Sequence, residues 1–504
     1  MLACLPLHTL SLVSHHRLDS SAAIADAAVE AAVDAAAASS AVDSAVGSAV
    51  AMDLPTEIWQ MIYEDIHDKK TLSRLSRTCR FLWELGIPLL YRKFETFDFN
   101  GGRPSHYQSL SAFIRTVSNN QYLAKVVTEM SCTTSAYTKH YDREDLFRQY
   151  SQYDSALVGD VARRLQVPVS NIRMSSAALW GVSSRSSFAH QLLVCSLPNL
   201  RTLEFRVPSS SEGFNECLSI WAKNPANRLW SLTKLKIEEE SISRRFNFAD
   251  VQDIIRYSPN LEYLSLKRCY SITADYDLDL RNLKRLRIIE SRFHREGLFL
   301  CKYCCHLENF TYISFGPHWA MDRLPAEIVV ALEPARQSLR RLEIFHFSRD
   351  GPREQHQGID SLRDFPVLEA VTLNPGALSP PSTTAAATAA GTGAHPHAPG
   401  RGMFVEKMPP SLVTLTLVNV SRDLFEDLRL FAQCVIEGGF PHLQTVSISG
   451  GPPDPRPDED RPPFEHLSES EWHLLRAMFE GGGIAFECQA DWWHRLRSLC
   501  DMAP

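Results

Sequence analysis

The sequence predicts an α/β fold in which a small helical module is followed by an irregular solenoid with a curved parallel sheet. Two observations predict this architecture. The segment 54–94 carries apolar residues at helical spacing, and the chain after residue 197 repeats one strand motif nine times. One strand and one helix cannot bury their own apolar faces, so stacked repeats are expected to share a continuous core.

The helical module begins at residue 54 and reads LPTEIWQMIYEDIHDKKTLSRLSRTCRFLWELGIPLLYRKF. Ile58, Ile62 and Ile66 are four residues apart and predict one apolar face of a first helix. A second helix is predicted by the spacing of Leu72, Leu75, Cys79 and Leu82. So short a segment has more apolar side chains than two helices can bury on each other, which indicates a surface for a partner.

This segment resembles the F-box. The matching residues are Leu54, Pro55, Glu57, Ile58, Ile62, Ile66, Leu72, Leu75, Cys79, Arg80, Leu82, Pro88 and Tyr91. The resemblance implies that the module docks on a Skp-type adaptor and, through it, joins a cullin–RING ubiquitin ligase. The residues implied for adaptor contact are Leu54, Pro55, Ile58, Ile62, Leu72, Leu75, Leu82 and Pro88. The alternative is an ordinary helical hairpin inside a larger fold.

The repeated motif is L-x-x-L-x-L, in which other apolar residues replace some leucines. The nine copies are Leu200/Leu203/Phe205, Leu232/Leu235/Ile237, Leu261/Leu264/Leu266, Leu283/Leu286/Ile288, Leu307/Phe310/Tyr312, Leu339/Leu342/Ile344, Leu368/Val371/Leu373, Leu412/Leu415/Leu417 and Leu443/Val446/Ile448. Successive copies begin 22 to 44 residues apart. The residues three and five places after the first leucine point to the same side of a strand. We expect them to form the core.

These copies resemble leucine-rich repeats, with one departure. The leucine-rich-repeat pattern has Asn or Cys eight residues after the first leucine, and only Cys269 conforms. The asparagine ladder is therefore expected to be absent and the curvature irregular. Together, the two modules resemble the degenerate F-box/leucine-rich-repeat proteins common in fungi, which are mostly taken to be substrate receptors. The resemblance thus implies an irregular leucine-rich-repeat solenoid that binds a substrate protein.

Strand alternation also predicts which residues face away from the core, namely those two, four and six places after each first leucine. In the first six repeats these positions hold seven Lys or Arg and three Glu, a net charge of +4, whereas the whole chain carries −7. Such a basic stripe suits an acidic or phosphorylated substrate segment. The candidate substrate-binding residues are Arg206, Lys234, Lys236, Tyr263, Lys267, Arg285, Arg287, Arg341 and Phe345. The alternative is that these positions are simply solvated.

The predicted domain order has five parts. Residues 1–51 are low-complexity, Ala-rich and expected to be disordered, with Met52 as a candidate start of translation. The F-box-like module occupies 52–98, and a helical linker with a cryptic first repeat, its strand at 123–127, occupies 99–196. The repeats occupy 197–488, with disordered insertions at 376–402 and 452–463, a helix at 469–479 and a closing strand at 484–486. Residues 489–504 form an end cap.

Composition narrows the remaining classes of function. The mild net negative charge argues against nucleic acid as the main partner. Neither a secretory signal nor a membrane span is evident, so twelve scattered cysteines predict a reduced intracellular setting, in the cytoplasm or the nucleus. The sequence Cys301-x-x-Cys304-Cys305-His306 has metal-like spacing, but a second ligand pair is not evident, so we interpret it as packing. We expect no metal and no cofactor.

We expect a receptor subunit without catalytic residues, because no nucleophile elbow, phosphate-binding loop or zinc-protease motif occurs in the sequence. Two alternatives stay open. One is a scaffold protein that binds the adaptor without ligase activity. The other is an enzyme carried on residues 101–196, which show no readable motif.

Overall fold

The computed structural model describes the following residues: 55–66, 68–96, 105–133, 157, 159–167, 190–207, 221, 224, 227–239, 246–270, 272, 278–291, 298–315, 325–347, 358–374, 377–378, 402–420, 422–449 and 467–488. The predicted Ala-rich segment, most of both predicted insertions and the predicted end cap lie outside them. Contacts divide the chain into two compact units. One comprises Met1–Phe94 and Asn119–Met130, and the other comprises Glu95–Ser118 and Ser131–Pro504.

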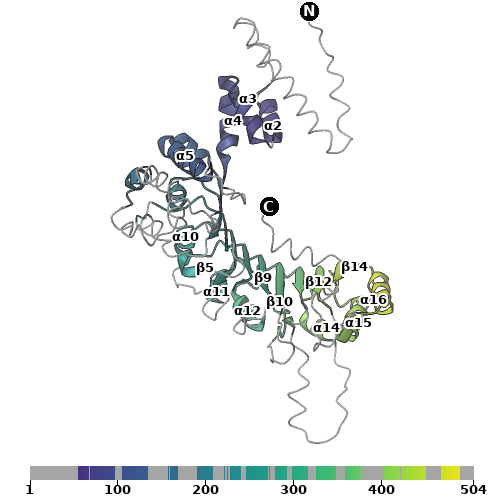
Figure 1. Cartoon of the computed structure of the whole chain (residues 1–504). Coiled ribbons are helices and arrows are strands. Elements are labelled where there is room, and N and C mark those ends of the chain that lie inside the picture. The colour runs from purple at the N-terminus through teal and green to yellow at the C-terminus, as the bar shows by residue number, and fades with distance from the viewer. Residues whose placement is uncertain are drawn as a thin grey trace, which may run out of the picture. The chain divides into compact units, whose positions relative to one another are not determined.

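The first unit is helical. Its helices are α2 (Thr56–Asp65), α3 (Lys69–Ser76), α4 (Arg80–Arg92) and α6 (Gln121–Val126), of which the first three are labelled in Figure 1. Side chains fix where these helices begin. Asp68 accepts a hydrogen bond from the backbone N–H of Thr71 (2.9 Å) at the start of α3. Asn120 accepts one from Leu123 (3.2 Å) at the start of α6.

The predicted second helix of this unit is wrong, because it is two helices. The chain turns at Arg77 and Thr78, and the hydroxyl of Thr78 donates to the carbonyl of Leu75 (2.7 Å). Cys79 then adopts an extended conformation (φ −152°, ψ 165°) and accepts from the N–H of Leu82 as the cap of α4. Apolar spacing continues across the break, so periodicity alone did not reveal it.

The predicted strand at 123–127 is also wrong. Those residues form α6 and its C-terminal flank, and Leu123 and Ala124 are buried. Asn120 explains the difference, since its side chain caps a helix that an apolar run by itself leaves ambiguous. A strand, β2 (Glu129–Thr133), begins shortly afterwards.

The described residues form an open, parallel sheet of twelve strands whose order follows the chain, and the ten strands from Thr202 onward lie wholly in the second unit. The strands are β1 (Lys93–Thr96), β2, β3 (Thr202–Val207), β4 (Lys234–Glu239), β6 (Tyr263–Lys267), β8 (Arg285–Ile289), β9 (Asn309–Phe315), β10 (Arg341–Phe347), β11 (Ala370–Leu373), β12 (Thr414–Val418), β13 (Thr445–Ser449) and β14 (Ala485–Cys488). A small second sheet pairs β5 (Phe246–Asn247) with β7 (Cys269–Tyr270). The predicted closing strand is thus confirmed as β14.

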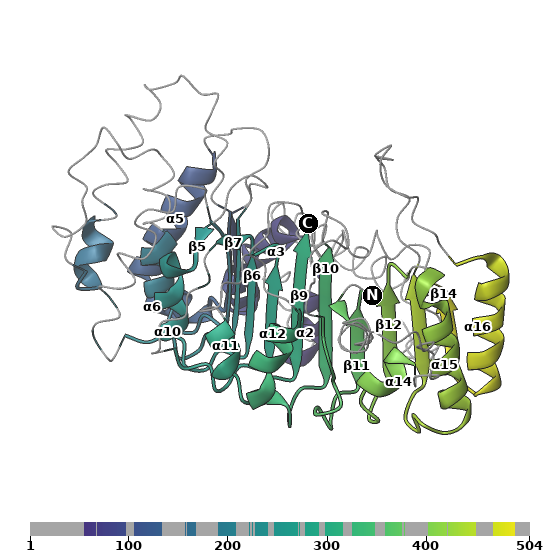
Figure 2. The same ribbon diagram turned by 90° about the horizontal axis from the view of Figure 1, so that it is seen from below.

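Helices of this unit line one face of the sheet, as Figure 2 shows for α10 to α16. The helices are α5 (Ser105–Asn119), α10 (Gln252–Arg256), α11 (Phe299–Lys302), α12 (Pro325–Ala331), α14 (Met403–Lys407), α15 (Phe425–Ile436) and α16 (Glu469–Gly481), with short 3-10 turns at Phe248–Asp250, Glu333–Ala335 and Arg422–Leu424. The predicted helix at 469–479 is confirmed as α16. Ser468 begins it with a capping box, in which Ser468 and Glu471 each bond the other's backbone N–H. Within the described residues, no helix is long and apolar enough to cross a membrane.

The core lies where the motif places it. In all nine copies, the residues three and five places after the first leucine are at most 1% exposed. They also stand in register between strands: Leu235 pairs with Leu264, Leu264 with Leu286, and so on to Val446 with Phe486. Register survives even the longest gap, since Val371 still pairs with Leu415. The predicted strands and their buried positions are therefore confirmed.

Side chains at the strand starts link neighbouring repeats. In five repeats the residue just before the first leucine donates a hydrogen bond to a backbone carbonyl of the preceding repeat. The bonds run from Ser231 Oγ to Pro198 (3.1 Å), Asn260 Nδ2 to Trp230 (2.8 Å), Asn282 Nδ2 to Pro259 (3.0 Å), Ser338 Oγ to Cys305 (3.2 Å) and Ser411 Oγ to Leu368 (2.9 Å). We call these five side chains the N-terminal ladder. It links repeats at the end of the strands opposite to that of the missing asparagine ladder.

A second recurrent feature follows the strands. Arg268, Glu290 and Asn419 each lie seven residues after a first leucine and have left-handed backbone conformations, with φ of 60°, 49° and 64°. Each N–H donates to a carbonyl of the next strand, for example Arg268 to Ile289 (2.8 Å). Arg268 also forms an ion pair with Glu290 (2.6 Å). The left-handed turn thus ends these strands while preserving a bond to the next repeat.

Candidate partner-binding surfaces

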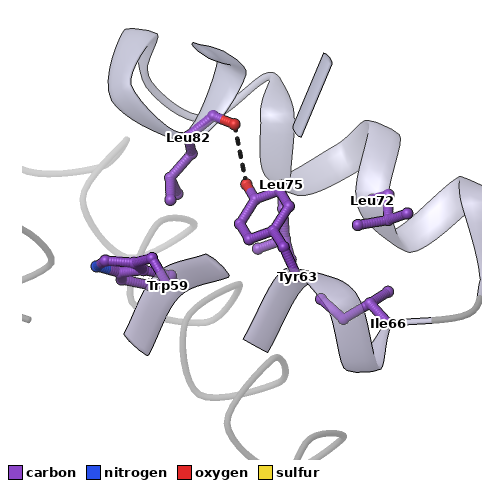
Figure 3. Packing of buried hydrophobic residues seen from close by; sticks show 6 residues of the cluster. All are labelled: Trp59, Tyr63, Ile66, Leu72, Leu75 and Leu82. Atoms are coloured by element: carbon purple, nitrogen blue, oxygen red, sulfur yellow. Dashed lines mark hydrogen bonds between the residues drawn. The ribbon is translucent and has the colours of Figure 1, made fainter. Parts of the chain in front are cut away.

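The helical unit has its own apolar core. It consists of Trp59, Tyr63, Ile66, Leu72, Leu75 and Leu82, drawn in Figure 3. The hydroxyl of Tyr63 donates to the carbonyl of Leu82 (3.1 Å), which ties α2 to α4. Burial raises the pKa of Tyr63 to about 12. The hydroxyl of Tyr63 therefore has its hydrogen-bond partner within the core, and the side chains of α2, α3 and α4 pack on one another.

Helix α2 turns a different face to this core than the one predicted. Its buried residues are Trp59 and Tyr63, one turn apart, whereas Ile58 is 40% exposed and Met61 is 62% exposed. The two aromatic side chains are larger than the isoleucines, so burying them removes more apolar area from water. The helix is thereby rotated by about one residue from the isoleucine stripe, although Ile66 stays in the core.

The residues predicted to contact the adaptor divide into two groups. Leu72, Leu75 and Leu82 are buried in the core of the unit and already have partners there. Pro55 and Ile58 are exposed, while Ile62 and Pro88 are half-buried. Leu54 lies outside the described residues.

Two exposed apolar residues were missed by the sequence reasoning. Met61 lies one turn after Ile58 on α2, and Trp83 on α4 is 46% exposed. The aromatic pair Trp59 and Tyr63 was the signal that could have revealed Met61, because a helix phased on that pair exposes Ile58 and Met61. We call Pro55, Ile58 and Met61 the α2 surface.

The sheet of the second unit carries its polar side chains in rows. The residues two places after each first leucine stand side by side across ten strands: Thr202, Lys234, Tyr263, Arg285, Asn309, Arg341, Ala370, Thr414, Thr445 and, in β14, Ala485. We call this set the first row; its cations lie on β4, β8 and β10, the second, fourth and sixth of these ten strands. Arg285 and Arg341 are exposed, and Lys234 and Tyr263 are half-buried.

Carboxylates engage two of the predicted substrate-binding lysines. Lys236 pairs with Glu204 (3.6 Å), and Lys267 pairs with Glu238 (2.5 Å). Each pair joins two adjacent strands and holds the ammonium group of the lysine against a carboxylate of the same chain. Lys236 and Lys267 are therefore less available to a partner than the sequence suggested.

The third predicted row is not a free surface. Residues six places after the first leucine on β6, β8, β9, β10, β12 and β13 are at most 8% exposed: Lys267, Ile289, Ile313, Phe345, Val418 and Ser449. Lys267 and Phe345, which the sequence places on the face toward a partner, are both buried in this structure. For Phe345 the reason is apolar neighbours, since Phe345 pairs with Ile313, and Ile313 with Ile289. Arg206, in the same row on β3, is half-buried.

Tyr263 is held between two cations. The ammonium group of Lys234 lies 5.4 Å from the centre of its ring, and Arg287 donates to its hydroxyl at 3.5 Å. Both contacts run between adjacent strands and fix the orientation of these side chains before any partner binds. Lys234, Tyr263 and Arg287 thus form one ordered group.

The cysteine cluster splits between the interior and the surface. Cys301 and Cys304 are buried, and burial raises the pKa of Cys301 to about 12 and that of Cys304 well above its usual value. Cys304 donates to the carbonyl of Leu300 (3.0 Å). Cys305 and His306 are exposed. Among the described residues, no three Cys, His, Asp or Glu side chains are placed to hold a metal ion.

The sequence matches no protein-family model and no curated protein.

Proposed function

We propose that this chain is the substrate-recognition subunit of an SCF-type ubiquitin ligase. In this proposal the helical unit binds a Skp-type adaptor, the adaptor links it to a cullin, and the sheet unit binds the substrate protein. The observation that carries the proposal is the α2 surface. Ile58 and Met61 are exposed on a unit whose core is already closed by other residues, so packing within the unit does not account for them.

The sheet unit supports the second half of the proposal. Parallel repeats that pair only with their neighbours form an extended sheet, on which polar residues of many strands lie in register. Such a surface can hold a protein segment without catalytic groups. A receptor of this kind accelerates ubiquitin transfer by keeping the substrate close to the charged conjugating enzyme.

The adaptor proposal is tested by capture of a purified Skp-type adaptor and cullin on the full chain, beside the double variant Ile58→Ser/Met61→Ser. Both side chains are exposed, so the variant should fold normally. Losing two apolar contacts at an interface centre typically costs about 2 kcal/mol or more, about a thirtyfold loss of affinity. The matched control is Val330→Ser, which changes an apolar residue on α12 that is still more exposed (70%) and should capture the adaptor as the native chain does.

Three results are possible. Capture of adaptor and cullin by the native chain and the control, but not by the double variant, supports the ligase receptor. Capture of the adaptor without cullin favours a scaffold that binds the adaptor alone. Equal capture by the double variant and the native chain, or no capture by either, contradicts a role for the α2 surface.

A further inference from the structure

We propose that the first row of the sheet unit binds an extended acidic peptide segment with carboxylates at every third residue. The proposed site is the basic row, defined as Lys234, Tyr263, Arg285, Asn309 and Arg341 on β4, β6, β8, β9 and β10. The inference rests on the proposed function only in calling this segment part of a substrate. The binding itself follows from the charges and their spacing.

The cations of the basic row keep their charge available to a ligand, and Lys234 is in addition oriented by the ring of Tyr263. Within the described part of the chain, no carboxylate forms an ion pair with Lys234, Arg285 or Arg341. By contrast, the cations next to them are engaged: Lys236 with Glu204, and Lys284, just before Arg285, with Glu262 (3.1 Å). Carboxylates thus neutralise Lys236 and Lys284 but not these three cations.

No acidic residue interrupts the row. Between the three cations lie Tyr263 and Asn309, both half-buried and both able to hydrogen-bond a peptide backbone. Beyond Arg341, the row continues with Ala370, Thr414 and Thr445, which carry no charge. The positive charge is therefore confined to five adjacent strands on a chain whose net charge is −7. An acidic ligand is the complementary partner.

Register fixes the spacing of the charges. Neighbouring strands lie about 4.8 Å apart, so cations on alternate strands stand about 10 Å apart. A polyproline II helix advances about 3.1 Å per residue with three residues per turn, so every third side chain lies on one face about 9 Å further on. A peptide in that conformation, crossing the strands, would place its acidic groups opposite Lys234, Arg285 and Arg341 in turn.

The arrangement favours carboxylates over phosphates. A phosphate group carries close to two negative charges and is usually held by several converging donors. In the basic row the three cations stand on alternate strands, about 10 Å apart, so no two of them converge on one phosphate group. One arginine and one carboxylate match in charge and can form two parallel hydrogen bonds.

The test uses the full chain and a fluorescent peptide of four Glu-Pro-Pro units, in which proline imposes the polyproline II conformation. Two control peptides carry Gln in place of Glu, or the same residues with all glutamates adjacent. We expect the first peptide to bind and both controls to bind at least about tenfold more weakly, since they lose hydrogen bonds between oppositely charged groups. Arg285→Gln and Arg341→Gln should each weaken binding by about tenfold. Lys284→Gln is the matched control and should not.

Several outcomes would overturn the proposal. They are no binding of the Glu-Pro-Pro peptide, equal binding of the glutamine peptide, and native affinity in both arginine variants. Equal binding of the peptide with adjacent glutamates would refute the spacing. Much tighter binding of a phosphoserine-Pro-Pro peptide would show that the basic row prefers phosphate groups to carboxylates. Adaptor capture by the arginine variants should stay native, so this inference and the proposed function fail by different measurements.

Discussion

Gly86 in α4 offers the sharpest test of how the helical unit is packed. A Cβ atom added at Gly86 would overlap the hydroxyl of Ser76 and lie 2.8 Å from Cε1 of Tyr63 and 3.1 Å from Cβ of Ser76. Ser76 is buried, and its hydroxyl donates to the carbonyl of Leu72 (2.7 Å). Neither neighbour can therefore move away without breaking a bond or shifting the core shown in Figure 3.

The expected effect of Gly86→Ala is the balance of two terms. Alanine inside a helix is favoured over glycine by about 0.5–1 kcal/mol. Overpacking a buried site typically costs about 1–3 kcal/mol, and displacing the Ser76 hydroxyl loses a hydrogen bond worth about 1 kcal/mol. We expect a net destabilisation of about 1–3 kcal/mol, so the unit should open about five- to a hundredfold more often.

Hydrogen-exchange mass spectrometry of the full chain measures this opening in peptides from α4. The double variant Ser76→Gly/Gly86→Ala removes the overlap and should recover part of the lost protection. Gly481→Ala is the matched control, because Gly481 ends α16 with no atom within 4 Å of an added Cβ. It should leave protection of α16 unchanged or raised. Native protection of α4 in Gly86→Ala would refute the packing described for this unit.

Three further predictions follow from single side chains. Between pH 10 and about 12, Tyr63 is ionised in the unfolded chain but keeps its proton in the folded unit, so the free energy of unfolding falls as pH rises through that window. The melting temperature of Tyr63→Phe should therefore fall less than that of the native chain over the same range. An identical fall in both proteins would contradict the burial of Tyr63. Asn260→Ala breaks the bond to Trp230 in the N-terminal ladder and should cost about 1 kcal/mol in urea denaturation, whereas an unchanged midpoint would show that the ladder is not stabilising. At Asn419, whose φ is 64°, Gly should be tolerated but Val should destabilise by more than about 1 kcal/mol; equal midpoints for the two variants would argue against the left-handed turn.

Much of the sheet could be predicted from the sequence, because the side-chain period of a strand is two. The spacing of Leu264 and Leu266 already places both on one side, and the structure buries both. The phase of α2 could not be predicted from its isoleucines. Choosing between the face of Ile58 and that of Trp59 depends on what α3 and α4 present to it. Similarly, the cap formed by Cys79 depends on local backbone geometry that apolar spacing does not encode.

The candidate surfaces were predicted less completely than the core. Alternation correctly placed Arg285 and Arg341 on the exposed side of the sheet. It could not show that Lys236 and Lys267 are engaged by Glu204 and Glu238, because strand register must be known before cross-strand pairs can be read. The N-terminal ladder did leave a trace in the sequence, since Pro259-Asn260 directly precedes a first leucine.

The pairing of Val371 with Leu415 across the longest gap has a consequence for how such a chain can be rebuilt. Ile359 donates from its N–H to the carbonyl of Ala377 (2.8 Å) and accepts from the ammonium group of Lys407 in α14 (3.0 Å), so residues at both ends of the intervening stretch are clamped to the same residue. The distance between β11 and β12 is then set by these hydrogen bonds and by strand pairing, not by the length of the chain between the two strands. A reporter domain or an affinity tag inserted between Leu378 and Gly402 should therefore leave the pairing of β11 with β12 unchanged.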